Sequence, residues 1–407
     1  MLISYSSYTF VAKLIKITSK MKQPIILIPG IQGTKLQNVN ERDFHVLWSG
    51  VKKFFSNIHK LKLQKDGVSD VGAERLVERA DVEDIAYSEI INYLRSKGYR
   101  VYIFGYDWRK SNVESAKKLA ELITSLTNKL NTSSFNFLTH SMGGLVLSAY
   151  IKSLNVAERN KIINKAIFTV PPFLGSIEAS FNLTIGKSRL FNSSDDFRKV
   201  SRTFPSIYEL LPVYNDTYEF ENAETETHFN KYDFSTYWQQ VAKLLPHRKD
   251  TLKKHRLMSH RLKELGKVRE QDDFVFDFRD CEEELRSKLL VIAGSNAKTK
   301  HKIYVKNSMG HIKNFFDYEH FKETKDGDGT VPLKSAIPFK DVITTLVVRQ
   351  RKLETWADSR FIMADWHAFM LNNGRVQNII KRFLKADDET LKGDSWYLSI
   401  DDYTKRA

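Results

Sequence analysis

Residues 135–144 read FNFLTHSMGG, an apolar run that stops at a serine and continues into two glycines. The next seven residues, Leu145 to Ile151, are mostly apolar, which is typical of a helix packed on a core. A strand, a sharp turn and a helix in this order present a serine hydroxyl above a sheet. Ser141 is therefore the candidate nucleophile, although Thr139 stands where such a turn usually has its first glycine.

A serine hydroxyl is barely ionised near neutral pH, so acyl transfer by Ser141 needs three further groups. A base must take the hydroxyl proton, an acid must orient that base, and N–H donors must stabilise the oxyanion. Where a strand, turn and helix present the nucleophile in this way, the three side chains follow along the chain as Ser, then Asp or Glu, then His. The acid and the base are therefore expected after residue 141.

The candidate base is His367, one of eleven histidines in the chain. It follows the last predicted strand and directly precedes a C-terminal helical segment, which is the position that this order requires. His140 is the immediate neighbour of Ser141, and its side chain is expected to point away from the serine hydroxyl.

The candidate acid is Asp328, within the turn DGDGTVP at residues 326–332. It is preferred over Asp326 because glycines flank it on both sides, so the carboxylate can reach an imidazole without steric conflict. An ordinary turn is the alternative interpretation. A calcium loop needs more oxygen ligands and a terminal glutamate, and neither a metal nor a cofactor is expected. By topology, the oxyanion donors are expected to be the backbone N–H groups of Ile31 and Met142.

Short apolar runs alternate with segments of helical spacing. The runs at residues 24–30, 99–104, 135–140, 166–170, 289–294 and 342–348 predict strands, and those at 83–97, 113–130 and 376–384 predict helices. This alternation predicts an α/β fold with a mostly parallel central sheet and helices on both faces. The strand before Ser141 is expected in the middle of the sheet, and residues 31–36 are expected to form a loop.

The alternation stops after residue 176 and resumes near residue 289, which predicts an insertion in the core. The expected organisation is an N-terminal extension (1–20), a first part of the core (21–176), a cap or lid (177–285), a second part of the core (286–384) and a loosely held polar tail (385–407). A chain of 407 residues, 42% of them hydrophobic, is long enough to bury such a core.

The chain is basic, with 64 Lys and Arg against 49 Asp and Glu, a net charge of +15. Such an excess favours an anionic partner. The run from His247 to Arg269 predicts one or two basic amphipathic helices. Two interpretations stay open: a solvated face of the cap, or a surface in peripheral contact with an anionic membrane. Few aromatic residues interleave the run, so nucleic acid is not favoured as a partner.

The one cysteine, Cys281, excludes an intramolecular disulfide and favours a reducing compartment. Lysines interrupt the apolar residues of the first 21 positions, which argues against a signal peptide. No run approaches the roughly 18 apolar residues expected of a membrane-spanning helix. The sequence therefore predicts a cytoplasmic protein, with peripheral membrane contact left open.

Six features follow one another along the chain: IPGIQG at 28–33, YDWR at 106–109, HSMG at 140–143, PPFLGS at 171–176, GDGTV at 327–331, and His367. Over roughly residues 24 to 384 this set resembles the lecithin:cholesterol acyltransferase-like family, which includes lysosomal phospholipases and phospholipid:diacylglycerol acyltransferases. The resemblance implies an α/β-hydrolase fold with a cap, and action on lipid esters. It also implies a triad of Ser141, Asp328 and His367, with Ile31 and Met142 as oxyanion donors.

The predicted function is that of a serine-dependent lipid acyl hydrolase or O-acyltransferase that acts on lipid or phospholipid esters through an acyl-enzyme. Two alternatives remain: a soluble carboxylesterase on small or glycosidic esters, and a non-catalytic binding module for an acidic partner. The YDWR motif is expected to be structural. The cap carries no motif that the resemblance transfers, so the substrate's identity stays open.

Overall fold

A computed structural model describes most of the predicted core and part of the predicted cap. The described residues are 22–39, 46–48, 58–64, 66–72, 76–185, 195–214, 217–221, 275–305, 316–351, 366–385 and 398–406. The predicted N-terminal extension at 1–20 and the basic run at 247–269 lie outside the described residues.

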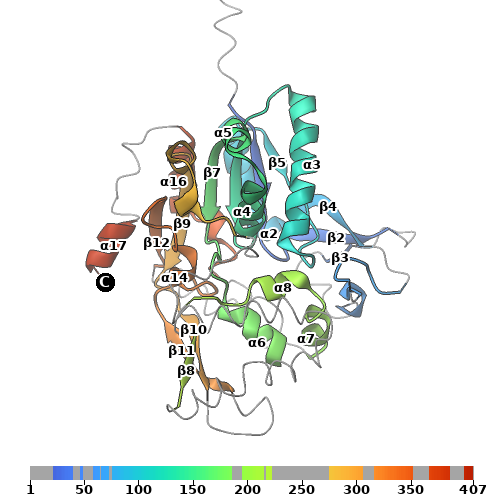
Figure 1. Ribbon diagram of the computed structural model, residues 1–407, viewed down its shortest axis with the longest axis vertical. Helices are drawn as coiled ribbons and strands as arrows, with labels where there is room; N and C mark the ends of the chain where they lie inside the picture. The colour runs from blue at the N-terminus through green and yellow to red at the C-terminus, as the bar shows by residue number, and fades with distance from the viewer. Residues whose placement is uncertain are drawn as a thin grey trace, which may run out of the picture.

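A seven-stranded sheet in the order β13-β12-β9-β7-β6-β1-β5 forms the centre of the molecule (Figure 1). Its strands are β1 (Ile25–Ile28), β5 (Val101–Ile103), β6 (Phe135–His140), β7 (Ile163–Thr169), β9 (Leu289–Ser295), β12 (Thr344–Arg349) and β13 (Leu398–Ser399). All neighbours pair in parallel except β12 and β13. The predicted parallel sheet is confirmed, and β6 lies in its middle, between β1 and β7.

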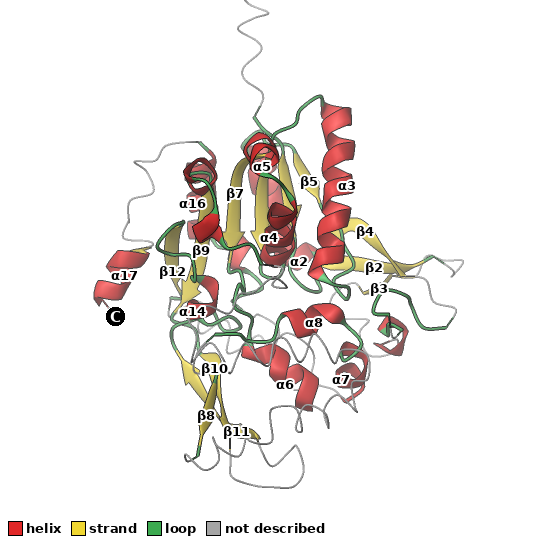
Figure 2. Ribbon diagram, in the orientation of Figure 1, coloured by secondary structure: helices red, strands yellow, loops and turns green. Residues whose placement is uncertain are grey.

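Helices cover both faces of this sheet, as predicted (Figure 2). Along β1, Ile26 and Ile28 belong to one buried cluster and Ile25 and Leu27 to another, because successive side chains point to opposite faces. The first cluster includes residues of α3 (Asn112–Leu130) and α4 (Gly143–Ser153), and the second includes residues of α2 (Asp84–Ser96) and α16 (Gly374–Leu384). This two-sided burial explains why β1 is apolar at every position.

Both ends of α3 are capped. Ser111 accepts a hydrogen bond from the N–H of Val113 at the amino end, and Asn131 adopts a left-handed conformation at the carboxyl end. Buried Leu119, Ile123 and Leu126 share the face that packs on the sheet. No helix in the described part of the chain combines the length and the hydropathy needed to cross a bilayer.

A second, antiparallel sheet contains β2 (Thr34–Asn38), β3 (Val46–Trp48) and β4 (Leu76–Val82). The loop predicted at residues 31–36 is therefore wrong from Thr34 onward. Burial alternates along β2, but Leu36 is its only large apolar residue, so the strand lacks the apolar alternation that would reveal it.

Three helices and a third sheet lie on one side of the central sheet, beyond the end of β7 (Figure 1). The helices are α6 (Ile177–Ile185), α7 (Asp195–Ser201) and α8 (Pro205–Glu209); the sheet contains β8 (Tyr218–Phe220), β10 (Thr299–Val305) and β11 (Phe316–Thr324). β8 belongs to the predicted cap, whereas β10 and β11 fall within the predicted second part of the core. The predicted second part of the core therefore contributes β10 and β11 to a sheet that it shares with β8 of the predicted cap.

The remaining elements are short. They are η1 (Ile58–Leu61), α5 (Val156–Ile162), η2 (Phe278–Asp280), α12 (Glu283–Arg286), α14 (Leu333–Ala336), η3 (Met370–Asn372) and α17 (Ile400–Arg406).

The described end of the chain is packed on the core, whereas a loosely held tail is expected from residue 385. β13 pairs with β12, and Leu398, Ile400 and Tyr403 are buried against it. These three apolar residues are too few, in a segment otherwise polar, to produce a recognisable pattern in the sequence.

Candidate active site

Ser141 occupies a tight turn between β6 and α4. Its φ angle of 52° is left-handed, a conformation that costs a non-glycine residue roughly 1–2 kcal/mol. Two backbone hydrogen bonds hold the turn: the N–H of Ser141 donates to the carbonyl of Thr169, and the N–H of Gly144 donates to the carbonyl of Ser141, both over 2.9 Å. The side chain is thereby presented at the carboxyl end of a central strand.

Glycines allow the loop after β1 to lie directly against this turn. A Cβ on Gly143 would lie 2.4 Å from the carbonyl oxygen of Ile28 and 2.6 Å from that of Pro29. A Cβ on Gly30 would lie 3.0 Å from Cβ of Ser141. The close approach brings the loop that contains Ile31 next to the serine.

Thr139, the residue that departs from the usual motif, fits because of a glycine neighbour. Its side chain is fully buried, and its hydroxyl donates to the carbonyl of Ile167 over 3.3 Å. A Cβ on Gly144 would already lie 3.4 Å from Oγ1 of Thr139, so a larger residue there would crowd the threonine. The turn keeps its geometry with a β-branched residue at this position.

The structure brings Ser141, Asp328 and His367 together in one hydrogen-bonded chain. Nδ1 of His367 lies 2.8 Å from Oδ2 of Asp328, and Nε2 lies 2.8 Å from Oγ of Ser141. A carboxylate only accepts, so Nδ1–H donates to it and Nε2 of the neutral ring accepts the serine hydroxyl. Ser141 and His367 are each 5% exposed and Asp328 is 1% exposed, so little bulk water reaches them.

The turn around Asp328 fixes its carboxylate. Oδ1 accepts hydrogen bonds from the N–H groups of Thr330 at 2.9 Å and Val331 at 2.7 Å, which leaves Oδ2 for the histidine. Gly329 has a φ of 102°, which favours glycine. A Cβ on Gly327 would lie 2.4 Å from Oγ1 of Thr299. A side chain at position 329 would be strained and one at position 327 would clash, which explains the glycine on each side of Asp328.

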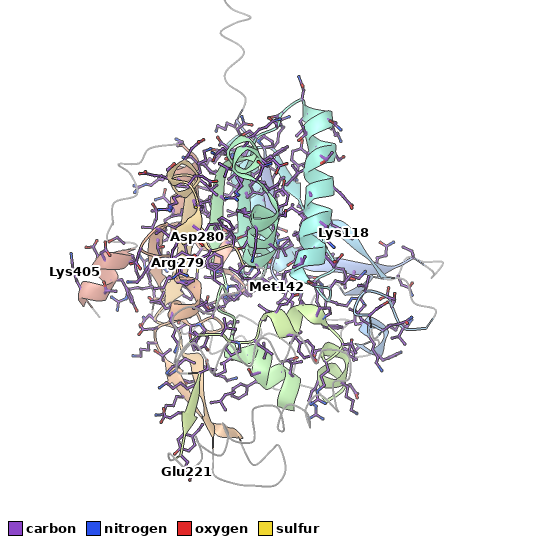
Figure 3. All side chains as sticks on the ribbon, in the orientation of Figure 1. Lys118, Met142, Glu221, Arg279, Asp280 and Lys405 are labelled. Atoms are coloured by element: carbon purple, nitrogen blue, oxygen red, sulfur yellow. The ribbon has the colours of Figure 1, made fainter. Side chains whose placement is uncertain are left out.

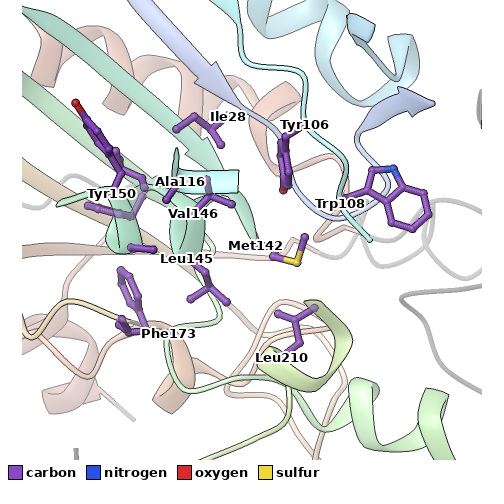
Figure 4. Packing of buried hydrophobic residues seen from close by; sticks show 14 of the residues in the cluster. Ile28, Tyr106, Trp108, Ala116, Met142, Leu145, Val146, Tyr150, Phe173 and Leu210 are labelled. Atoms are coloured by element: carbon purple, nitrogen blue, oxygen red, sulfur yellow. The ribbon is translucent and has the colours of Figure 1, made fainter. Parts of the chain in front are cut away.

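The backbone N–H groups of Ile31 and Met142, the expected oxyanion donors, belong to the loop after β1 and to the turn that contains Ser141. Met142 is the residue just before α4, where the helix dipole favours negative charge. Neither N–H donates a hydrogen bond to any residue that the structure describes. Met142 lies between the central sheet and α8, and its side chain shares one apolar cluster with Tyr106 and Leu210 (Figures 3 and 4).

Side chains of the YDWR motif, residues 106–109, hold the loop after β1 through hydrogen bonds to backbone carbonyls. The Tyr106 hydroxyl donates to the carbonyl of Pro29 over 2.8 Å, and Nε1 of Trp108 donates to the carbonyl of Thr34 over 3.0 Å. Arg109 is fully buried and donates to the carbonyl of Leu61. These contacts give the motif a structural role at the site.

Two residues near the triad were not identified as site residues from the sequence. Nε2 of His140 lies 2.9 Å from the carbonyl oxygen of His367, and Nδ1 lies 2.9 Å from the Tyr87 hydroxyl. Burial first, and then the neighbouring His367, lowers the pKa of His140 to about 3. Both ring nitrogens of His140 thus have partners other than the serine, and no sequence signal connects His140 with Tyr87, 53 positions earlier.

No group of three or more His, Cys, Asp or Glu side chains suited to a metal ion occurs among the described residues.

Comparisons with solved structures find several similar proteins. Tle4, from a structure of the Tle4–Tli4 complex, superposes with a TM-score of 0.56 at 14% identity, over 90% of this chain and 99% of that chain. The mature lipase BlEst2 of Bacillus licheniformis has a TM-score of 0.40 at 10% identity, over 89% and 92%. Phospholipase PlaB from Legionella pneumophila has 0.28 at 14%, over 46% and 34%. No curated protein matches the chain by sequence.

At such low identity, the likeness to Tle4 concerns the fold alone, which is the α/β-hydrolase fold. The family is shown by a separate comparison, because the lecithin:cholesterol acyltransferase family model matches residues 46–338, well over half of the chain. The chain belongs to the lecithin:cholesterol acyltransferase family.

Proposed function

We propose that this protein is a serine-dependent acyl hydrolase or O-acyltransferase that acts on lipid or phospholipid esters through an acyl-enzyme on Ser141. The observation that carries the proposal is the chain of two 2.8 Å contacts from Asp328 through His367 to Ser141. Nucleophile and base lie within hydrogen-bonding reach, and a third group orients the base, which is the arrangement that activates a serine.

In the first half-reaction, Oγ of Ser141 forms a bond to the ester carbonyl carbon while its proton passes to Nε2 of His367. The carbonyl oxygen becomes an oxyanion, which the N–H groups of Ile31 and Met142 stabilise. The carbon–oxygen bond to the alcohol then breaks, and His367 returns its proton to the leaving alcohol. Asp328 stabilises the imidazolium throughout and keeps its own charge.

In the second half-reaction, water or an acceptor alcohol attacks the acyl-enzyme while His367 takes its proton. The bond to Ser141 breaks, and the serine regains a proton from His367. Water releases a fatty acid and an alcohol yields a new ester. The two outcomes differ in whether the site orients an alcohol near the acyl-enzyme and excludes water.

Family membership supports a lipid ester as the substrate. Peripheral contact with an anionic membrane is part of the proposal, and the net charge of +15 supports it. Binding to vesicles of anionic phospholipid should exceed binding to zwitterionic vesicles and weaken with added salt. Equal, salt-independent binding to both would overturn this part.

The proposal is tested with purified protein, mixed phospholipid vesicles and a long-chain alcohol. Acyl products are identified by mass spectrometry with and without the alcohol, for the wild type and Ser141→Ala. Ser153→Ala, on α4 but outside the site, is the matched control. A fluorophosphonate probe and a short-chain ester report whether the serine is reactive at all.

Free fatty acid or acyl alcohol from the wild type and the control, and none from Ser141→Ala, is the expected result. Unchanged activity in Ser141→Ala would end the proposal. Turnover of short-chain esters alone, without any gain from vesicles, would favour a soluble carboxylesterase. No labelling and no turnover of any ester would favour a binding module.

A further inference from the structure

The ring of His140 joins two loops that meet at the nucleophile. Its Nε2 lies 2.9 Å from the carbonyl oxygen of His367. Its Nδ1 lies 2.9 Å from the hydroxyl of Tyr87, on α2. The same hydroxyl oxygen accepts the backbone N–H of Gly30 over 2.9 Å. Three buried hydrogen bonds thus run without interruption from the loop after β1 to the loop of the proposed base.

The direction of each bond in this network follows from its two ends. The carbonyl of His367 only accepts, so the proton of His140 is on Nε2 and Nδ1 of the neutral ring accepts. Tyr87 therefore donates its hydroxyl proton to Nδ1, and its oxygen is left to accept the N–H of Gly30. Burial favours the neutral ring that this order requires, in agreement with the lowered pKa of His140.

Both ends of the network lie at groups that the proposed mechanism uses. Gly30 directly precedes Ile31, the proposed oxyanion donor, and a Cβ on Gly30 would lie 3.2 Å from Nδ1 of His140. At the other end, the rings of His140 and His367 have centroids 5.3 Å apart. The network therefore connects the proposed oxyanion donor with the proposed base through the neighbour of the nucleophile.

We propose that His140 and Tyr87 are positioning residues. They fix the loop that contains Ile31 relative to the loop that contains His367, so that the oxyanion donor and the base act on the same ester carbonyl. The inference rests on the proposed function. Acylation requires the base to take a proton while the oxyanion donor binds the carbonyl oxygen. Misplacement of either loop by about 1 Å is enough to slow such a step strongly.

The first comparison sets four single variants beside the wild type. Tyr87→Phe removes one hydroxyl, His140→Leu removes both polar atoms of the ring, and His140→Gln keeps a donor and an acceptor. Tyr93→Phe is the matched control, because Tyr93 lies on α2 outside the network. For each variant we would measure kcat and KM on a short-chain ester, the rate of labelling by a fluorophosphonate, and Tm.

Tyr87→Phe and His140→Leu are expected to lower kcat roughly 10- to 100-fold, the range found for residues that orient the ligands of catalytic metals. Labelling should slow in parallel, and KM should stay within about 2-fold. His140→Gln should recover part of the lost kcat, because its amide can still donate to the carbonyl of His367. Tyr93→Phe should match the wild type.

The double variant Tyr87→Phe/His140→Leu should lose no more activity than the worse single variant, because both changes break one network. Additive losses would overturn the proposal, as would a fall in Tm with kcat unchanged, or a His140→Gln no better than His140→Leu. If His140→Leu does not fold, Tyr87→Phe and His140→Gln decide. Activity in Ser141→Ala would refute the proposed function itself, whereas an inactive Ser141→Ala beside a fully active Tyr87→Phe refutes only the positioning role.

Discussion

The hydroxyl of Tyr403 donates a 2.5 Å hydrogen bond to Oδ1 of Asp326, two residues before the proposed acid Asp328. Tyr403 belongs to α17, near the end of the described chain, and its ring is buried. Burial first, and then the bond to Asp326, raises the pKa of Tyr403, so its hydroxyl remains a donor near neutral pH. α17 therefore supports the turn that contains the proposed acid.

Tyr403→Phe should lower the free energy of unfolding by about 1–2 kcal/mol, since it removes a hydrogen bond to a charged group. It should also lower kcat roughly 2- to 10-fold, because the acid turn loses one of its supports. Denaturant unfolding and ester hydrolysis measure the two effects. Lys405→Ala, at an exposed position of the same helix, is the control. A stability loss without any change in kcat would show that α17 does not influence the acid turn.

Gly143→Ala should disrupt the site, because the new Cβ would meet the carbonyl oxygen of Ile28 at 2.4 Å. Backbone oxygens cannot move aside cheaply, so the loop after β1 or the serine turn must shift, at a cost of about 1–3 kcal/mol. We expect poor yield of folded protein, or folded protein that a fluorophosphonate labels slowly.

Gly374→Ala is the matched control for this change, because no atom lies within 4 Å of a Cβ at that helical glycine. It should keep full activity and raise the free energy of unfolding by up to about 1 kcal/mol. If Gly143→Ala behaved like Gly374→Ala, the tight packing of the loop against the serine turn would be refuted.

The parts of the fold that the sequence predicted are those buried on two sides. β1, β6 and β9 have every residue buried. β1 and β9 are short, nearly continuous apolar runs that composition alone reveals, and β6 has apolar residues at three of its first four positions. Ser141, Asp328 and His367 could be selected because chain order limits the choice, and because the turns at Ser141 and Asp328 contain glycines. Their mutual contacts followed from the fold.

The features that the sequence did not predict depend on contacts between distant and mostly polar segments. β10 reads TKHKIYV, with polar side chains at most positions, and it forms a strand through pairing with β8 and β11. His140 contacts the backbone of a residue 227 positions away, which leaves no local pattern. Such features follow only from the assembled tertiary structure.

The free energy of unfolding should fall with acid between pH 6.5 and about 3 because of His140. Its pKa is about 3 in the folded chain against an ordinary value of 6.5, so within this window only the unfolded chain binds the proton. Stability therefore rises with pH there, by at most about 1.4 kcal/mol per pH unit from this group.

Urea unfolding of the wild type and His140→Gln at pH 7.5 and 5.5 isolates this contribution. His140→Gln should be the less stable protein at pH 7.5, because glutamine does not match the shape of the buried imidazole ring. It should nevertheless lose less stability than the wild type on acidification. Parallel losses in the two proteins would show that His140 is protonated in the folded chain.

Arg109 and Arg279 form the same local fork and differ in burial. Each donates from Nε and from its own backbone N–H to an aspartate two residues earlier, Asp107 or Asp277. The side chain of Arg109 is 0% exposed, and it also pairs with Asp70 at 2.8 Å, whereas that of Arg279 is 57% exposed. Burial raises the pKa of Asp107, but the charge and hydrogen bonds of Arg109 outweigh it and leave the pKa lowered.

Arg109→Lys should therefore lower the free energy of unfolding by about 2–4 kcal/mol, because a lysine cannot satisfy two carboxylates and a carbonyl in a buried site. Arg279→Lys should cost less than about 1 kcal/mol, because water solvates the exposed pair. Denaturant unfolding of the two variants gives the difference directly. Arg109 directly follows Trp108, which together with Tyr106 holds the loop after β1. Its replacement should therefore also lower kcat, whereas Arg279→Lys should leave kcat unchanged. Equal costs for the two variants would contradict the assignment of Arg109 as the buried support of the site.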